Sequence, residues 1–197
     1  MRLILIPLLF GFILPGTTRA QNTDIDLLHR INSSGTPFLD QASKILSFSV
    51  TPVLCAGPLS VFICGLTRHD SLLKRRSYVI GASLVLAAGI TTGLKLIVDR
   101  PRPFVVYPFI IKKGEAGSYS FPSGHTSGAF SVATSLSLAF PKWYVIAPSF
   151  LWASAVGYSR MELGVHYPSD VLAGACIGAA SGWLMWEANR WLAGRKK

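Results

Sequence analysis

Residues 121–128 read Phe121-Pro122-Ser123-Gly124-His125-Thr126-Ser127-Gly128 and lead into an uncharged apolar run that ends at Phe140. The stretch combines a proline, a serine of the type that caps helices, a glycine and a histidine. A helix that begins here would direct its free backbone N–H groups and the positive end of its dipole towards the surroundings of His125. The stretch indicates an anion site beside a titratable ring, although Pro-Ser-Gly also occurs in ordinary turns before helices.

The composition around this stretch is typical of an integral membrane protein. Of the 197 residues, 50% are hydrophobic and only 14% are charged, whereas a soluble domain carries about a quarter charged residues. The length suits one domain. The net charge is +10, and the positive residues lie between apolar segments and not in a basic run interleaved with aromatic residues. We therefore expect it to reflect membrane topology and anionic lipid or phosphate groups, and we expect no nucleic-acid partner.

Five apolar segments are candidates for membrane-crossing helices, namely residues 45–67, 77–94, 126–140, 143–158 and 171–186. Pro52 and Pro58 are expected to kink the first segment or to mark its start. The positive-inside rule assigns the basic loop 68–76 and the basic C-terminal end to the cytoplasm. Loops 95–120 and 159–170 then lie on the periplasmic side of a bacterial inner membrane. The sequence predicts an all-α membrane bundle of five or six transmembrane helices.

The N-terminal part precedes the first of these segments. Residues 1–20 contain a lone Arg2, a short apolar run and the sequence Thr18-Arg19-Ala20, which resembles a cleavage site. They are interpreted as a cleaved signal peptide, with a short first transmembrane helix as the alternative, and residues 21–197 form the membrane domain. In residues 21–44, apolar side chains recur at helical spacing around a break at residues 32–35. We predict two short periplasmic helices that lie on the membrane surface, with a plain linker as the alternative.

The three cysteines, Cys55, Cys64 and Cys176, all lie within apolar runs. Their spacing is not that of a metal site, and an odd number argues against a disulfide framework. We expect them to be small, buried hydrophobic residues.

Four positive residues of the first outer loop contradict the topology rule, namely Arg100, Arg102, Lys112 and Lys113. A bound anion would explain positive charge on this side of the membrane. Asp99, Arg100 and Glu162 are interpreted as interfacial charges that pair with one another, with a role in tuning the site as the alternative.

Polar residues suited to anion chemistry lie at the outer ends of three different spans. A lone lysine, arginine or histidine at a membrane boundary is usually an anchor or is satisfied locally. Convergence of several such residues at one end of a bundle favours a functional site. The set consists of Lys95, Arg102, Ser123, His125, Arg160, His166 and Asp170.

The chemistry that this set could perform is phosphoryl transfer. The cations and the Ser123 hydroxyl suit phosphate oxygens. His166 offers a nucleophile whose second ring nitrogen is held by Asp170, and His125 is left to protonate the departing oxygen. The sequence contains no acidic cluster able to hold Mg²⁺ or Ca²⁺. We therefore expect a phosphohistidine intermediate and neither a metal nor another cofactor.

Three linked motifs resemble the signatures of a known family. Lys95-x6-Arg102-Pro103, Pro122-Ser123-Gly124-His125 and Ser159-Arg160-x5-His166-x3-Asp170 resemble the motifs of the type 2 phosphatidic acid phosphatase (PAP2) superfamily in order and spacing. The resemblance covers residues 24–186 and implies a metal-independent phosphatase in an all-helical bundle. It implies that His166 is the nucleophile, Asp170 its partner and His125 the general acid. The phosphate would be bound by Lys95, Arg102, Ser123, Gly124 and Arg160.

The resulting hypothesis is an inner-membrane lipid phosphatase that removes a phosphate from a lipid headgroup at the periplasmic surface. Candidate substrates are undecaprenyl pyrophosphate, lipid A phosphate, phosphatidylglycerol phosphate and phosphatidic acid. Two alternatives stay open at this point. One is a phosphotransferase that passes the phosphoryl group to another lipid, and the other is a non-catalytic lipid-binding membrane protein.

Overall fold

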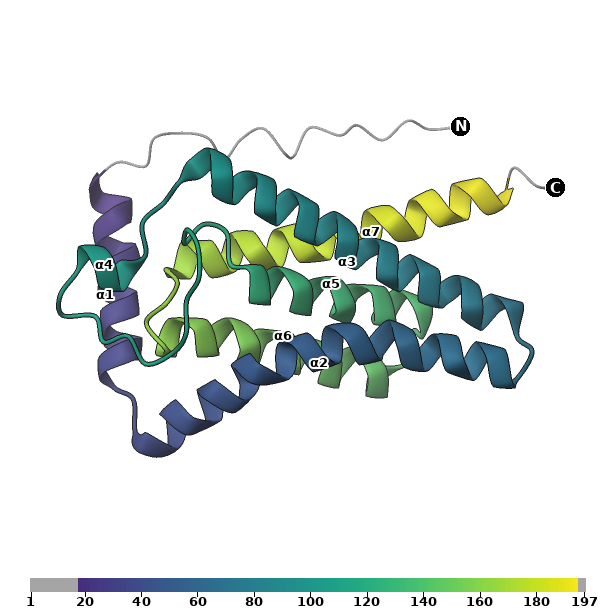
Figure 1. The fold of residues 1–197 in the computed structure, drawn as a ribbon, viewed down its shortest axis with the longest axis horizontal. Helices are drawn as coiled ribbons and strands as arrows, with labels where there is room; N and C mark the ends of the chain where they lie inside the picture. Colours follow the sequence, from purple (N-terminus) through teal and green to yellow (C-terminus); the bar gives the residue numbers. More distant parts are fainter. Residues whose placement is uncertain (1–17, 195–197) are drawn as a thin grey trace.

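The computed structural model describes residues 18–194, and within this range the secondary structure is helical, without a strand. The helices are α1 (Thr18–Ser33), α2 (Pro37–Thr67), α3 (Ser71–Val98), α4 (Pro103–Val106), α5 (Gly124–Ala139), α6 (Trp143–Glu162) and α7 (Pro168–Gly194), as Figure 1 shows. The predicted all-α fold is confirmed. The prediction for the N-terminal signal peptide or first span falls almost entirely on residues outside the described range.

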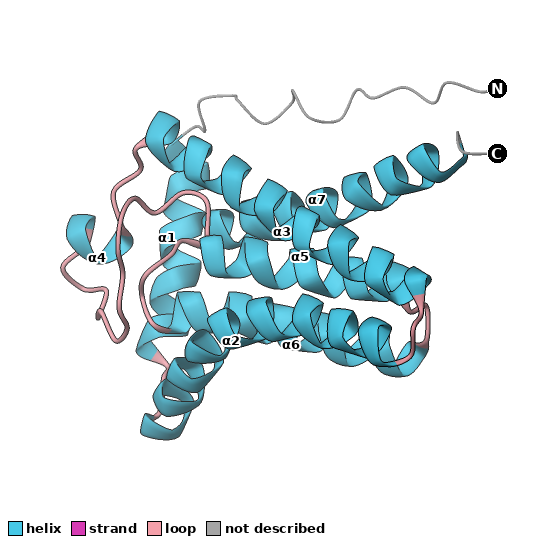
Figure 2. Cartoon of the chain, turned by 45° about the vertical axis from the view of Figure 1, so that its right-hand side comes forward, coloured by secondary structure: helices cyan, strands magenta, loops and turns pink. Residues whose placement is uncertain are grey.

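Five long helices run back and forth along the molecule, while α1 lies across one end of them (Figure 1). The central helix is α5, which is in contact with α2, α3, α6 and α7. The connection from α3 to α5, which contains α4, is long and lies at the end that carries α1, whereas the connections at the opposite end are short (Figure 2). The architecture therefore places its long connection at one end of the bundle.

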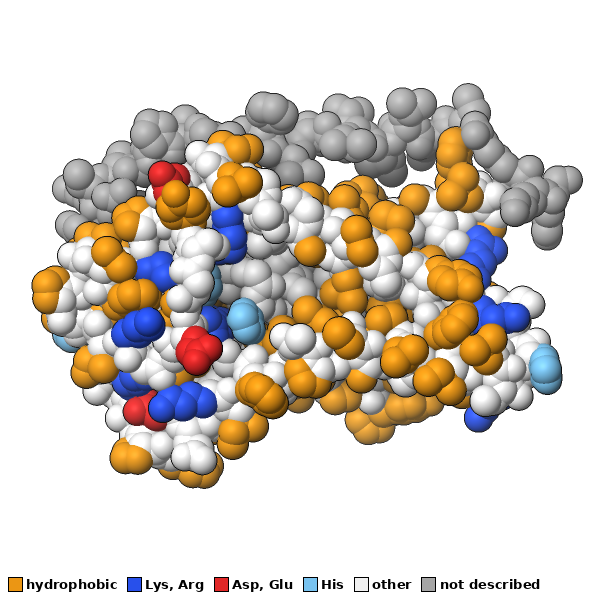
Figure 3. All heavy atoms as spheres, in the orientation of Figure 1, with side chains coloured by type: hydrophobic (Ala, Val, Ile, Leu, Met, Phe, Trp, Pro, Cys, Tyr) orange, Lys and Arg blue, Asp and Glu red, His pale blue; other side chains and the backbone are white. Residues whose placement is uncertain are grey.

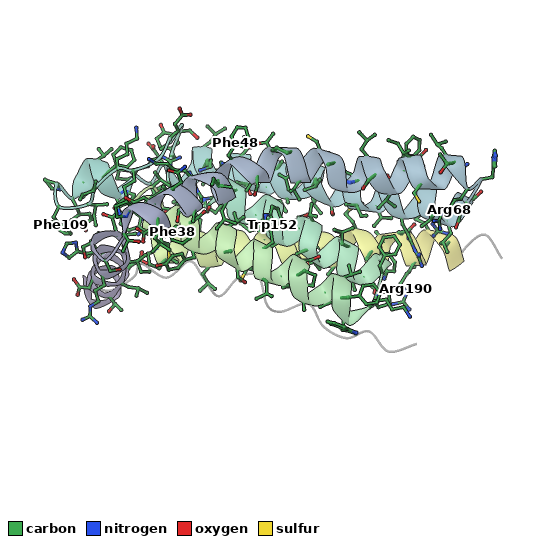
Figure 4. The ribbon with its side chains drawn as sticks, turned by 90° about the horizontal axis from the view of Figure 1, so that it is seen from below. Phe38, Phe48, Arg68, Phe109, Trp152 and Arg190 are labelled. Carbon is green, nitrogen blue, oxygen red and sulfur yellow. The ribbon has the colours of Figure 1, made fainter. Side chains whose placement is uncertain are left out.

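The outer surface of the bundle is suited to a lipid environment. Three helical segments are long and apolar enough to cross a membrane, namely α2, the segment that contains α3, and α7. Phe38 and Phe48 on α2 are each 81% exposed, and Figure 4 shows Arg68 and Arg190 at the end opposite to Phe38 and Phe109. The chain is a membrane protein. Helix α5 has 16 residues and rises only about 24 Å, so it is shorter than α2, α3 and α7.

Close contact between α5 and α7 depends on small residues. Gly174, Gly178 and Gly182 recur every fourth residue on α7 and face α5. A Cβ atom at Gly174 would lie 2.6 Å from the Ser123 carbonyl oxygen. Stripes of small residues allow helix backbones to approach closely in membranes. The glycines thus bring the first turn of α7, which carries Asp170, against the start of α5.

The N-terminal half differs from the predicted arrangement of two short surface helices. Only α1 is separate, because the second predicted helix is the first part of α2, which begins at Pro37. The Thr36 side chain accepts a hydrogen bond from the Leu39 N–H at 3.2 Å and caps the helix there. Pro52 and Pro58 lie inside α2 and do not mark its start, since membrane helices tolerate proline where neighbouring groups satisfy the backbone.

Helix α1 also differs from the prediction in what its apolar face contacts. Ile25 and Leu28 are buried against Ile110 and Tyr167, so this face packs on protein and not on the membrane surface. The linker alternative for this region is therefore wrong as well. Because it packs in this way, α1 supports the loops at the end of the bundle.

Two further predictions need correction. The predicted basic loop 68–76 is shorter, because the Asp70 carboxylate accepts the N–H groups of Leu72 at 2.7 Å and Leu73 at 3.2 Å and α3 begins at Ser71. Cys55 and Cys176 are exposed, whereas burial was expected. Apolar residues of a membrane helix can face lipid as well as the protein core, so hydrophobicity alone does not distinguish the two.

Candidate active site

The predicted site residues gather at the end of the bundle that carries the long connection. Figure 3 shows Lys, Arg and His side chains on this end, whereas hydrophobic side chains cover much of the long helices. The contributing elements are the last turn of α3 (Lys95), the segment before α4 (Arg102), the start of α5 (Ser123, Gly124, His125), the last turn of α6 (Arg160), the loop 163–167 (His166) and the first turn of α7 (Asp170). Residues up to 75 positions apart in the sequence thus lie together.

His166 is the most enclosed of the titratable rings at this end, with 2% of its surface exposed. Its Nε2 atom lies 3.4 Å from Nη1 of Arg102, and its Nδ1 atom lies 3.5 Å from Oδ2 of Asp170. Burial lowers the pKa of His166 to about 4, although Asp170 opposes this effect. The ring is therefore neutral at pH 7, with one nitrogen towards a cation and the other towards a carboxylate.

The loop that carries His166 is shorter than predicted and is held from two sides. Helix α6 continues to Glu162, and α7 begins at Pro168, a residue suited to the first turn of a helix. Gly164 has a φ angle of +70°, and a Cβ atom there would lie 3.0 Å from Nδ2 of Asn32. Asn32 of α1 donates from this nitrogen to the Glu162 carbonyl at 2.9 Å. The loop is therefore fixed against α1.

The Asp170 carboxylate is fully buried and accepts hydrogen bonds on both oxygens. Oδ2 accepts the Ser120 hydroxyl at 2.5 Å and the Tyr167 N–H at 2.9 Å. Oδ1 accepts Nη1 of Arg100 at 2.7 Å. The carboxylate is therefore held in place independently of His166. Ser120 was not predicted to take part, and the sequence carries no motif that singles it out. For Arg100, tuning of the site was the alternative to pairing with Asp99 or Glu162, and the contact with Asp170 agrees with that alternative.

The Arg102 guanidinium is held by backbone carbonyl groups. Its Nε donates to Ser118 at 2.7 Å, and Nη1 donates to Val165 at 2.8 Å. The Lys95 ammonium donates to the Tyr119 carbonyl at 2.5 Å. These carbonyl oxygens orient both cations and leave their formal charge uncompensated.

Arg160 is 3% exposed and is held in a similar way. Its Nη1 donates to the Ser47 hydroxyl and its Nη2 to the Glu115 carbonyl at 3.3 Å, while Nε is buried without a hydrogen-bond partner. Within residues 18–194, no carboxylate forms an ion pair with Lys95, Arg102 or Arg160. Buried donors and charges normally find partners, so this arrangement is suited to an anion.

The start of α5 contributes to the site as follows. Ser123 is fully buried, its hydroxyl lies 2.8 Å from the Thr126 hydroxyl, and its N–H donates to the Asp170 carbonyl at 3.0 Å. Gly124 and His125 are partly exposed. His125 lies within electrostatic range of Arg160, His166, Arg102 and Lys95. The structure thus brings His125 into the same charged environment as His166, whereas the Ser123 groups already have protein partners.

The predicted explanation for the four positive residues of the outer loop, a bound anion, is wrong for Arg100 and Lys113. Arg100 binds Asp24 and Asp170, and Lys113 binds Asp40 and Glu162. The Lys112 ammonium lies 5.0 Å from the centre of the Phe104 ring. The prediction that Asp99, Arg100 and Glu162 pair with one another is wrong for the same reason. The carboxylates Asp24 and Asp40 are 76 and 73 residues away from their partners, and sequence proximity gave no indication of these pairs.

Together, the fold and the site geometry define a helical membrane protein in which two histidines, a held carboxylate and three cations gather at one end of the bundle. A family model described as the PAP2 superfamily matches residues 77–193. The chain belongs to the PAP2 superfamily.

Comparisons with individual proteins agree with this assignment. The chain is 32% identical over 130 residues to a lipid A 4′-phosphatase of Bacteroides thetaiotaomicron, over 58% of each protein. It is 36% identical over 113 residues to an undecaprenyl-diphosphatase of Sulfolobus acidocaldarius, over 55% of this chain and 54% of that protein. The chain thus spans a little over half the length of these relatives. The crystal structure of Aquifex aeolicus LpxE superimposes with a TM-score of 0.75 at 29% identity, over 84% of this chain and 95% of that one.

Proposed function

We propose that this chain is a lipid phosphatase that hydrolyses a lipid phosphate monoester or pyrophosphate at the periplasmic surface of a bacterial inner membrane. The observation that carries the proposal is the position of a buried histidine beside cations that have no carboxylate partner in the described part of the chain. A phosphate group at this place would meet positive charge and a ring nitrogen together. The names of the two relatives indicate the same class of substrate.

The cations are suited to the charge of a transferring phosphoryl group. Catalysis of phosphoryl transfer relies mainly on positioning and on electrostatic stabilisation of the equatorial oxygens. Arg102 and Lys95 are oriented by carbonyl oxygens, so they need not reorganise when the charge develops. In this scheme the balance of charge comes from side chains, and the proposal requires no metal ion.

The two histidines take complementary roles in the proposed reaction. His166 attacks phosphorus through Nε2 and forms a P–N bond, while the bond between phosphorus and the lipid oxygen breaks. His125, which takes up a proton once the phosphate anion is bound beside it, gives this proton to that oxygen. The lipid alcohol then leaves, or the lipid monophosphate when the substrate is a pyrophosphate. Water then attacks phosphorus, and His125 takes a proton from it. The P–N bond breaks, so that inorganic phosphate is released and His166 returns to its neutral form.

Asp170 stabilises the positive charge that the His166 ring acquires on phosphorylation. Its Oδ2 atom faces Nδ1 of His166 at 3.5 Å, and Nδ1 has no hydrogen-bond partner among the described residues. Such catalytic contacts are often long before the substrate binds and shorten in the reacting complex. The Nδ1 proton would point to Asp170, which leaves the Nε2 lone pair for the phosphate.

The proposal includes the membrane arrangement. Helices α2, α3, α5, α6 and α7 would cross the bilayer, with the turn at Arg68 and the basic C-terminal end in the cytoplasm. Residues 1–20 would be a signal peptide or a sixth span before the membrane domain 21–197. The phosphate would lie at the aqueous end of the bundle, and the acyl or prenyl chains would stay in the bilayer.

The test is phosphate release by the detergent-purified full chain, measured with EDTA present. The panel contains undecaprenyl pyrophosphate, lipid A, phosphatidylglycerol phosphate and phosphatidic acid. Wild type should release phosphate from at least one lipid, and His166→Ala should be slower by at least about a thousandfold. His69→Asn is the matched control, because His69 is exposed in the turn at the far end and has a positive φ that asparagine tolerates.

The remaining outcomes separate the alternatives. Equal rates for wild type and His166→Ala would contradict the proposed mechanism. Transfer of phosphate only when a second lipid is added would identify a phosphotransferase. Binding of these lipids with no release or transfer from any of them would identify a lipid-binding protein.

A further inference from the structure

A second charged cluster lies directly behind Asp170, and its residues are not among the specified positions of the family motifs. It consists of Asp24 on α1, Arg100 after α3, and Ser169 at the start of α7. We propose that Arg100, held by Asp24, positions the Asp170 carboxylate for His166, so that α1 is a working part of the active site. This inference rests on the proposed function above.

The Arg100 guanidinium is fixed on several sides at once. Its Nη1 donates to Asp170 Oδ1 and to the Ser169 hydroxyl, both at 2.7 Å. Its Nη2 donates to Asp24 Oδ2 at 2.9 Å. The guanidinium carbon lies 3.8 Å from the centre of the Tyr167 ring. A planar fork that stacks on a ring and bridges two carboxylates uses features that lysine lacks.

Asp24 ties the other end of the cluster to α7. Its Oδ1 accepts the Ser169 N–H at 2.9 Å, and its Oδ2 accepts the Ser169 hydroxyl at 2.6 Å. The N–H groups of a first helical turn have no partner within their own helix. Asp24 therefore caps α7 from another helix, one residue before Asp170. Asp24 and Arg100 hold the Asp170 segment through its backbone and its side chain.

The charges of the cluster leave Asp170 able to act on His166. Asp24 and Asp170 are negative and Arg100 is positive, so the three together retain one negative charge. The other charged or titratable groups that face His166 are Arg102, Arg160 and His125. Asp170 is thus the carboxylate facing His166 in the described chain. Because Arg100 is shared with Asp24, it orients Asp170 and does not neutralise it fully.

The cluster also lies between Asp170 and an open groove with mainly apolar walls. Asp24, Arg100 and Ser169 line one part of a groove of about 900 Å³, whose other walls are mainly apolar residues such as Leu27, Phe130 and Leu172. Asp170 itself is fully buried. The polar cluster thus covers the carboxylate on the side away from His166.

The experiment compares Arg100→Gln, Arg100→Lys and Asp24→Asn with wild type in the phosphate-release assay. Arg100→Gln should lower kcat by about 10- to 100-fold, the usual effect of losing a group that orients a functional side chain. KM should change by less than about threefold, because Arg100 does not contact the phosphate. Arg100→Lys should recover only part of kcat. Arg190→Gln is the matched control, since its pair with Glu187 is exposed at the opposite end.

Two readouts distinguish positioning from a purely structural role. The acid limb of the kcat/KM profile should move to higher pH in Arg100→Gln and to lower pH in Asp24→Asn, because these changes remove a positive and a negative charge near His166. Asp24→Asn should also lower kcat much less in an Arg100→Gln background than in wild type. A loss of folded protein alone would move neither readout.

The outcomes for the inference and for the proposed function can be told apart. No phosphate release by wild type would overturn both. Release by wild type that depends on His166, together with an unchanged kcat and acid limb in Arg100→Gln, would overturn only the positioning role. If Arg100→Gln does not yield a monodisperse folded protein, Asp24→Asn decides, because it changes one charge at nearly constant volume. An unchanged kcat and acid limb in that variant overturns the inference.

Discussion

Two groups of cations lie at the same end of this molecule and differ in what holds them. Arg100 and Lys113 each contact two carboxylates. Lys95 and Arg102 are held by backbone carbonyls, and Arg160 by a hydroxyl and a carbonyl. Carbonyl dipoles orient a cation without cancelling its charge, whereas a carboxylate does both. Anion binding is therefore expected where the counter-ion is missing and not wherever positive charge accumulates.

The paired group has a different consequence for the structure. Arg100 connects α1 to the start of α7, and Lys113 connects the outer loop to α2 and to the end of α6. Both pairs hold the segments from which the unpaired cations and His166 project. The comparison thus separates the cations that we propose bind the substrate phosphate from the cations that pair with carboxylates and hold the surrounding segments, and the variants below test this separation.

The largest effect is expected for an unpaired cation. Arg102→Gln should lower kcat/KM by about a thousandfold, comparable to the loss of a main oxyanion donor. Arg102→Lys should recover only part of this loss, since lysine keeps the charge but not the fork that binds Ser118 and Val165. The measurement is steady-state phosphate release with the best lipid of the panel. An activity near wild type for Arg102→Gln would contradict the assignment of this residue to the phosphate.

The second effect concerns the carboxylate behind the nucleophile. Asp170→Asn should lower kcat by about a hundredfold, because the amide cannot stabilise a positively charged His166 ring. The fold should persist, since the amide oxygen can still accept hydrogen bonds from Ser120 and the Tyr167 N–H. Arg100, which would then face the amide nitrogen, keeps Ser169 and Asp24 as acceptors. Circular dichroism and the rate of phosphate release, measured on the same preparation, check both parts. Equal kcat values would assign Asp170 to structure alone.

The third effect is a pH dependence. Burial lowers the pKa of His166 to about 4, with Asp170 opposing this shift, so the neutral nucleophile persists as the pH falls to about 5. The measured activity is first corrected for ionisation of the phosphate, whose second pKa is near 6. The corrected activity at pH 5.5 should be about ten times higher than the activity expected if the nucleophile were a histidine with an ordinary pKa of about 6.5. Asp170→Asn removes the negative charge that favours the protonated ring, so the acid limb should move to still lower pH. An acid limb near pH 6.5 would contradict this description of His166.

Much of the helical frame could be predicted from the sequence, because a long uncharged run between polar segments crosses a membrane as a helix that satisfies its own backbone hydrogen bonds. The residues of the site could be proposed because motif spacing at three helix ends selects His125, His166 and Asp170. The glycine stripe of α7 was overlooked, although its four-residue spacing in an apolar helix is a recognisable signal.

The frame around the site could not be predicted from local patterns. Asp24 pairs with a residue 76 positions away, and a single aspartate in an amphipathic stretch carries no indication of its partner. Hydrophobic periodicity identified α1 as helical but not the protein surface on which it packs. The same limit explains why Arg100 and Lys113 were grouped with Arg102, because a count of charges in a loop does not show which of them have carboxylates nearby.

The smallest effect on activity is expected for a paired cation of the frame. Lys113→Gln leaves the fully buried Glu162 side chain and Asp40 without the ammonium that contacts them at 2.9 and 2.8 Å. Loss of one partner of a buried ion pair costs about 3 kcal/mol, so the thermal unfolding midpoint in detergent should fall by several degrees. Measured below both midpoints, kcat should stay within about threefold of wild type. Lys112→Gln is the matched control, because its ammonium only lies over the Phe104 ring and its loss should cost about 0.5 kcal/mol. If Lys113→Gln instead lowered kcat as strongly as Arg102→Gln with an unchanged unfolding midpoint, the division between frame and substrate cations would be wrong.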